Sequence, residues 1–129
     1  MEQRQTRTLA RLQALSALKK EAELAKLATV AASRSRLQAA LTALKRTEAP
    51  LDPTGDTATI DPAMLGARLA HRRWIEAQQR RLNQQLALVT ADFLRQKPAA
   101  ARAYGRAAVL EQLVERMQSD HRHKRDRTP

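Results

Sequence analysis

The chain lacks several residue types on which globular and secreted proteins depend. Its 129 residues include no cysteine, which excludes disulfides and thiol chemistry. It has one Phe, one Tyr and one Trp, whereas aromatic side chains usually fill much of a thick core. No apolar run approaches the roughly 20 residues of a membrane span, and the Arg- and Lys-rich start does not resemble a signal peptide. We therefore expect a cytoplasmic protein without a globular core.

What the chain does contain favours long helices. Its hydrophobic residues, 43% of the total, are mostly Ala and Leu. Both residues are strong helix formers, and they make thin seams between two or three helices. The sequence therefore predicts an elongated, all-α molecule with much exposed surface.

Residues 47–61 are expected to form the turn between two helices. This stretch and Pro62 hold three of the five prolines, and it has four acids and no Lys or Arg. Pro50, Pro53 and Gly55 disfavour helix, whereas Asp61 can cap a new helix that begins at Pro62. The prediction is a single domain, an antiparallel two-helix coiled-coil hairpin over residues 1–129. Its expected elements are a helix at 3–46, the turn at 47–61, a helix at 62–97 and a terminal helix at 99–125.

The first helix changes its apolar pattern halfway. Its second half has the spacing of a coiled-coil seam. Upstream, leucines recur every three residues or at a double step, so they wind around the helix and one partner helix cannot cover them all. These leucines could be covered by a third helix, by neighbouring helices that approach closely over alanines, or by another protein, and the sequence leaves all three open. The seam residues are Val30, Leu37, Leu41 and Leu44, and the winding residues are Leu9, Leu12, Leu15, Leu18, Leu24 and Leu27.

The second helix carries a regular heptad seam, and its partner positions depend on the turn. A turn centred near Thr54 places residue i beside residue 108 minus i. Pro98 is expected to kink or break the helix, and Gly105 weakens it further. Residues after about 106 then have no counterpart, so the terminal stripe either folds back or overhangs as a binding surface. The seam is Ile75, Leu82, Leu86, Val89 and Phe93, preceded by Met64, Leu65 and Leu69; the stripe is Val109, Leu110, Leu113, Val114 and Met117.

The net charge of +11 is unevenly distributed. Residues 48–61 carry four acids and no base, whereas the segments on either side are basic. Such polarity suits different partners at the two ends, although solubility alone also explains it.

No residue pattern predicts catalysis, a cofactor site or a metal site. The three glycines are scattered, so there is no phosphate-binding loop. His121 and His123 point to different faces of a helix, and three turn acids, Asp52, Asp56 and Asp61, lack calcium-loop spacing. We therefore expect no enzymatic activity.

Paired arginines along the second helix leave nucleic acid binding open. Arg72–Arg73 and Arg80–Arg81 recur on nearly one face, near Arg68, and such a row can contact phosphates. A solvated helix face is the favoured interpretation, because the nearby aromatics are too few for a stacking platform. Trp74 is expected to be half exposed, either at the seam edge or as an interface anchor.

The chain resembles the flagellar export protein FliJ and the related injectisome stalk proteins of the YscO group. The resemblance covers nearly the whole chain in length, helix order and lack of aromatics. Its local motifs are Arg106-Ala-Ala-Val-Leu-Glu-Gln-Leu-Val-Glu-Arg116, Leu9-Ala-Arg-Leu12 and Lys20-Glu-Ala-Glu-Leu24. The basic tail, His121–Arg127, and the proline-rich turn depart from the family pattern.

The resemblance implies a non-enzymatic stalk protein of type III secretion, peripherally associated with the inner-membrane export apparatus. Its implied partners are the hexameric export ATPase, the cytoplasmic domain of the membrane export gate and the export chaperones. Residues 4–24 and 106–125 are expected to engage the ATPase ring, and the middle of the chain a second partner. The expected ATPase contacts are Arg4, Arg7, Arg11, Leu110, Leu113, Arg116 and Met117; those for the second partner are Leu37, Leu41, Leu69 and Trp74. The alternatives are a basic helical nucleic-acid-binding protein and a coiled-coil structural adaptor.

Overall fold

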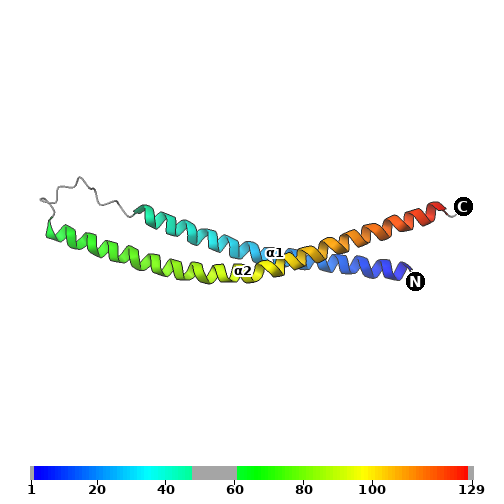
Figure 1. Ribbon diagram of the computed structural model, residues 1–129, viewed down its shortest axis with the longest axis horizontal. Coiled ribbons are helices and arrows are strands. Elements are labelled where there is room, and N and C mark those ends of the chain that lie inside the picture. The colour runs from blue at the N-terminus through cyan, green and yellow to red at the C-terminus, as the bar shows by residue number, and fades with distance from the viewer. Residues whose placement is uncertain (1, 48–60, 128–129) are drawn as a thin grey trace. The chain divides into compact units, whose positions relative to one another are not determined.

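The computed structural model describes residues 2–47 and 61–127, and all of them except Asp61 are helical. Helix α1 spans Glu2–Thr47 and helix α2 spans Pro62–Arg127 (Figure 1). The predicted all-α fold is confirmed, and the two helices run in opposite directions within each of its compact units. Most of the predicted turn lies outside the described residues.

The helix ends have the expected chemistry where they are described. Asp61 accepts a hydrogen bond through Oδ1 from the backbone N–H of Ala63, at 3.2 Å. Its carbonyl oxygen accepts the first helical bond, from the N–H of Leu65 at 3.0 Å. This is the geometry of an N-cap, and Pro62 takes the first helical position. At the other end of α1, Lys45 and Arg46 lie in the last turn, where cations complement the helix dipole.

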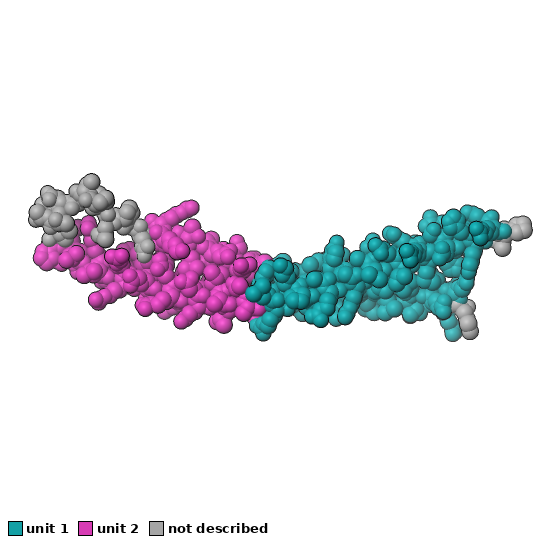
Figure 2. All heavy atoms as spheres, viewed as in Figure 1, with its two compact units in different colours: residues 1–29, 93–129 teal, residues 30–92 magenta. Residues whose placement is uncertain are grey.

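The chain divides into two compact units, each built from parts of both helices (Figure 2). Unit 1 contains residues 1–29 and 93–129, and so brings the two ends of the chain together. Unit 2 contains residues 30–92.

In both units, the least exposed residues of α1 recur at alternating steps of three and four, the spacing of heptad positions a and d. In unit 2 they include the predicted seam residues, Val30, Leu37, Leu41 and Leu44. In unit 1, by contrast, most of the seam positions of α1 carry polar residues. The unit 1 positions are Thr6, Leu9, Gln13, Ser16, Lys20, Glu23 and Leu27.

The facing seam of α2 contains the predicted residues from Ile75 to Phe93 and then changes character. In unit 1 its buried positions are Ala100, Ala103 and Ala107. Small side chains let two helix backbones approach closely, so the polar side chains of α1 can lie across them with their heads at the seam edge. Lys20 is an example, because its Nζ lies over the ring of Tyr104, 5.5 Å from the centroid.

The observed register corrects the sequence-based pairing rule. Residue 2 lies beside residue 124, residue 6 beside 121 and residue 20 beside 104. The rule had paired residue 6 with residue 102, about five helical turns away. The rule failed because it assumed that the last residue of α1 lies directly opposite the first residue of α2.

Two further predictions are corrected by this register. The terminal stripe neither folds back nor overhangs, because residues 121 and 124 lie beside the start of α1. Instead, the first turns of α2 in unit 2 extend beyond the end of α1 (Figure 1). Every residue from Asp61 to Trp74 is exposed, so Met64, Leu65 and Leu69 do not form a covered seam.

The sequence predicted a kink or a break at Pro98, and the break does not occur, because α2 is continuous through this residue. Pro98 is exposed and lies two residues after the seam residue Gln96, on the outer side of the helix. The carbonyl that loses its partner, that of Leu94, belongs to an exposed residue that water can reach. The loss of one hydrogen bond on the solvent side is therefore compatible with an unbroken helix.

The alanine seam predicts a sharp difference between neighbouring alanines. Replacing Ala103 by Leu should lower the free energy of unfolding by about 1–3 kcal/mol, because the larger side chain overpacks the buried seam. Replacing the exposed Ala101 by Leu should change it by less than about 0.5 kcal/mol. Urea unfolding measures both variants. Equal stability of the two variants would contradict the seam assignment.

Gly105 offers a stabilising substitution. A Cβ built at this position meets no atom within 4 Å, and the described glycines have no positive φ. Gly105→Ala should therefore raise the free energy of unfolding by about 0.5–1 kcal/mol, because alanine loses less backbone entropy in a helix. Thermal unfolding followed by circular dichroism is the measurement. A lower melting temperature would show that a close contact exists at this position.

Candidate interaction surface

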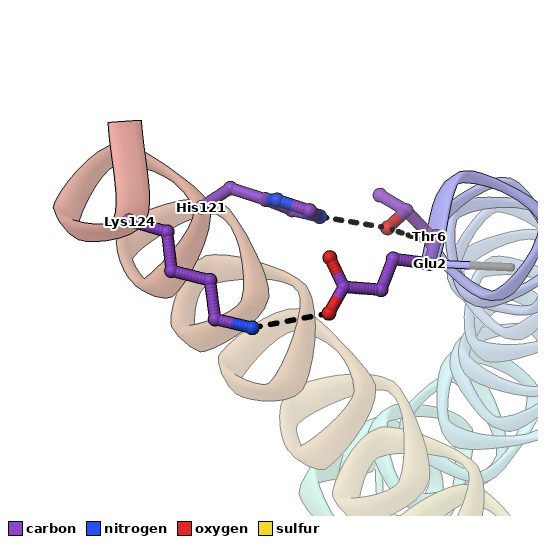
Figure 3. Close-up of polar contacts among 4 residues, drawn as sticks. All are labelled: Glu2, Thr6, His121 and Lys124. Atoms are coloured by element: carbon purple, nitrogen blue, oxygen red, sulfur yellow. Dashed lines mark hydrogen bonds and ion pairs between the residues drawn. The ribbon is translucent and has the colours of Figure 1, made fainter. Parts of the chain in front are cut away.

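The two ends of the chain are joined by polar contacts in unit 1 (Figure 3). Lys124 Nζ donates to Glu2 Oε1 at 3.0 Å, and both side chains are exposed. Thr6 Oγ1 donates to the carbonyl of Glu2 at 2.8 Å and lies 3.5 Å from His121 Nε2. Since the hydroxyl proton is already donated, a proton on Nε2 completes the contact with His121. These contacts hold the first turn of α1 beside the last turns of α2.

The same ion pair lowers the pKa of Glu2. The hydrogen bond from Lys124 is the largest cause, followed by the positive charge of Lys124 and then that of His121. Because the pair is exposed, solvent screens it and its contribution to stability is small.

Near the chain ends, unit 1 has a shallow hollow on each side of the seam between α1 and α2. The residues that line each hollow show which side chains of the two helices lie on the same side of the seam. Gln5 of α1 and Asp120 of α2 line one hollow, together with Glu2, Met117, His121 and Lys124. On the other side of the seam, Gln3 and Arg7 of α1 line a second hollow with residues of α2. Those residues are Gln118, Arg122 and Arg125, and the seam residues Thr6 and His121 complete the lining. Residues that flank the seam therefore have identifiable neighbours across it.

The structure divides the sequence-predicted ATPase contacts into exposed and seam residues. Leu110 and Met117 occupy seam positions of α2 and are partly buried against α1. The remaining residues are exposed on unit 1: Arg4, Arg7, Arg11, Leu113 and Arg116. These five side chains are more accessible to a partner than Leu110 and Met117.

The residues predicted for a second partner divide in the same way. Leu41 is buried and Leu37 half buried in the seam of unit 2, so the α1–α2 packing already covers them. Leu37 and Leu41 are therefore less accessible to a partner than Leu69 and Trp74. Leu69 and Trp74 are exposed, on the part of α2 that extends beyond α1. The prediction that Trp74 is half exposed is confirmed, with 55% of its surface accessible, and its ring stacks on His71 at 6.1 Å between centroids.

Four exposed apolar residues of unit 1 form a surface that was not predicted from the sequence. Leu12, Leu15, Val109 and Leu113 are each more than a third exposed. The spacing of the upstream leucines indicated that one partner helix cannot cover all of them. Only the register shows that Val109 and Leu113 of α2 lie beside Leu12 and Leu15.

Neither described helix is long and apolar enough to cross a membrane. In residues 2–47 and 61–127, no group of three or more His, Cys, Asp or Glu is placed to bind a metal ion.

Comparison with protein-family models, curated protein sequences and solved structures found no match to this chain.

The Glu2–Lys124 pair predicts a measurable pH dependence at the chain ends. The carboxyl of Glu2 should titrate below its ordinary pKa of 4.5. Because the folded pKa is depressed, the stabilising contribution is present above 4.5 and is lost as the pH falls through the folded value. Carboxyl NMR titration of the full chain measures this pKa.

Lys124→Met is the test variant. Lys97→Met is the matched control, because Lys97 is another exposed lysine of α2. The pKa of Glu2 should return toward 4.5 in the first variant and stay lowered in the second. An unchanged pKa in Lys124→Met would mean that the ion pair does not form in solution.

Proposed function

We propose that the protein is a non-enzymatic stalk or coupling protein of the flagellar type III export apparatus. In this proposal, it binds the hexameric export ATPase and the cytoplasmic domain of the export gate, and assists the recycling of export chaperones. It works in the cytoplasm, peripherally associated with the inner membrane. The family resemblance motivates this proposal, and the arrangement of unit 1 supports it physically.

The observation that carries the proposal is that both chain ends pack together as a narrow antiparallel pair of helices. Two helices, each about 10 Å across, that pack through small side chains make a slender body. Such a body suits the central opening of a protein ring better than a globular domain would. The sequence of this unit also carries fifteen Lys and Arg against seven Asp and Glu, which favours an acidic lining in the partner.

The proposed contacts follow the exposure of the side chains. Arg4, Arg7, Arg11, Leu113 and Arg116 contact the ATPase, whereas the seam residues hold α2 against α1. Leu69 and Trp74, exposed on the first turns of α2, are the proposed contacts for the export gate.

Nucleic acid binding has weaker physical support. Arg72 already forms an exposed ion pair with Glu76, at 3.9 Å. Trp74, the one aromatic residue beside these arginines in sequence, stacks on His71. Since binding without sequence preference draws on bases that stack on several rings, this part of α2 is poorly equipped for it.

The proposal is tested by mixing the full chain with its cognate export ATPase. Complex formation is measured by light scattering and ATP hydrolysis by phosphate release. We expect a complex with the hexamer and a changed hydrolysis rate. The double variant Arg4→Glu/Arg11→Glu should weaken the complex by about tenfold or more, because each reversal replaces attraction by repulsion at the interface.

The matched control is Arg80→Glu/Arg81→Glu, which makes the same charge change in unit 2. It should bind the ATPase as the unmodified chain does. Absence of a complex together with unchanged hydrolysis would remove the stalk proposal.

A further inference from the structure

One side of unit 1 carries a group of exposed apolar residues that we name the leucine face. Its members are Leu12 and Leu15 of α1 and Val109 and Leu113 of α2. Their exposed fractions are 48%, 63%, 56% and 41%, respectively. A folded chain usually leaves so many neighbouring apolar side chains accessible only where a partner covers them.

The hollow at the chain ends shows that these residues share one side. Gln5 and Asp120 line it from the two helices. Seven residues away from the chain ends along each helix, Leu12 takes the heptad position of Gln5 and Leu113 takes that of Asp120. Leu15 and Val109 occupy the adjoining heptad position, farther from the seam on the same side. The leucine face therefore spans both helices.

The opposite side of unit 1 differs in composition. Gln3, Arg7 and Gln118 line the hollow there. One heptad inward, these positions become Ala10, Ala14 and Glu111. At the level of Leu12 and Leu113, the opposite side of unit 1 therefore presents small and acidic residues. The residues of the leucine face lie on one side of unit 1.

Basic residues flank the leucine face. Lys19 and Arg106 follow Leu12 and Leu113 one heptad further inward, and Arg116 occupies the heptad position of Val109 one heptad toward the chain end. All three are exposed. Two acids, Glu2 and Asp120, line the hollow at the outer end, and Glu2 is paired with Lys124. An apolar centre between positive charges matches an amphipathic helix whose apolar stripe is bordered by carboxylates.

We propose that the leucine face binds an acidic amphipathic helix of a partner protein, which packs as a third helix along α1 and α2. Its leucines lie against Leu12, Leu15 and Leu113, and its Glu and Asp side chains meet Lys19 and Arg106. A second copy of this chain fits less well, because two leucine faces in contact would bring their basic residues together. The inference rests on this face and not on the identity of the ATPase, with which it shares two of the proposed contact residues, Leu113 and Arg116.

The test uses the full chain and a labelled synthetic helix of about four heptads, with Leu at positions a and d and Glu at e and g. Fluorescence anisotropy measures binding. The matched probe has Lys in place of every Glu. The acidic peptide should bind and the basic peptide should not. Equal binding of both peptides, or no binding of the acidic one, would overturn the proposal.

Variants locate the site. Leu12→Gln/Leu15→Gln should weaken binding at least about tenfold, because burial of a leucine contributes more than the 1.4 kcal/mol that corresponds to a factor of ten. Leu18→Gln is the control, since Leu18 is at least as exposed as Leu12 and Leu15 but lies on the outer side of α1, away from α2. Circular dichroism checks that all variants keep their helicity, which substitutions at exposed positions should preserve.

Charge reversal tests the contribution of the basic residues separately from that of the apolar residues. Lys19→Glu/Arg106→Glu should weaken the acidic peptide about tenfold or more and allow the basic peptide to bind. Unchanged affinity of Leu12→Gln/Leu15→Gln would exclude the leucine face as the site. A chain that dimerises through this face and releases no monomer to the peptide would show that a second copy is its occupant, and would also overturn the proposal.

Discussion

The close approach of α1 and α2 at three buried alanines determines much of what is distinctive in unit 1. Ala100, Ala103 and Ala107 occupy consecutive seam positions of α2. Because their side chains are short, the facing positions of α1 need not be apolar. By the observed register, Ser16, Lys20 and Glu23 are the polar seam residues of α1 at this level, and Leu18 and Leu24 beside them are left exposed.

This arrangement has a functional consequence. In an ordinary leucine seam, the strongest apolar residues are used for folding, and little remains for recognition. At the level of the leucine face, the seam positions of α1 are held by the polar residues Gln13 and Ser16, so Leu12 and Leu15 lie outside the seam and remain accessible on one side of the helix pair. The proposed leucine face therefore follows from how the seam is built. The positive charges around it select the kind of helix that can cover it.

Unit 2 uses its residues differently. Leu37, Leu41 and Leu44 meet the apolar seam of α2, so leucine is used there for folding. The accessible apolar residues of this unit include those that precede Ile75, on the turns of α2 that extend beyond α1. The same two residue types, leucine and alanine, thus serve opposite purposes in the two units.

The sequence by itself determined the two ends of α1, the start of α2 and the apolar half of the seam. Local chemistry decides these features: Asp61 and Pro62 start α2, and the heptad spacing from Ile75 to Phe93 defines its buried side. Only the tertiary structure decided the register, the continuity of α2 through Pro98 and the membership of the leucine face. Register depends on which seam positions of two distant segments meet, and alanine and polar residues carry no apolar signal that reveals it. The spacing of the upstream leucines indicated that some of them are exposed, but Leu12 and its neighbour Leu113 could be identified as members of one face only after Glu2 was found beside Lys124.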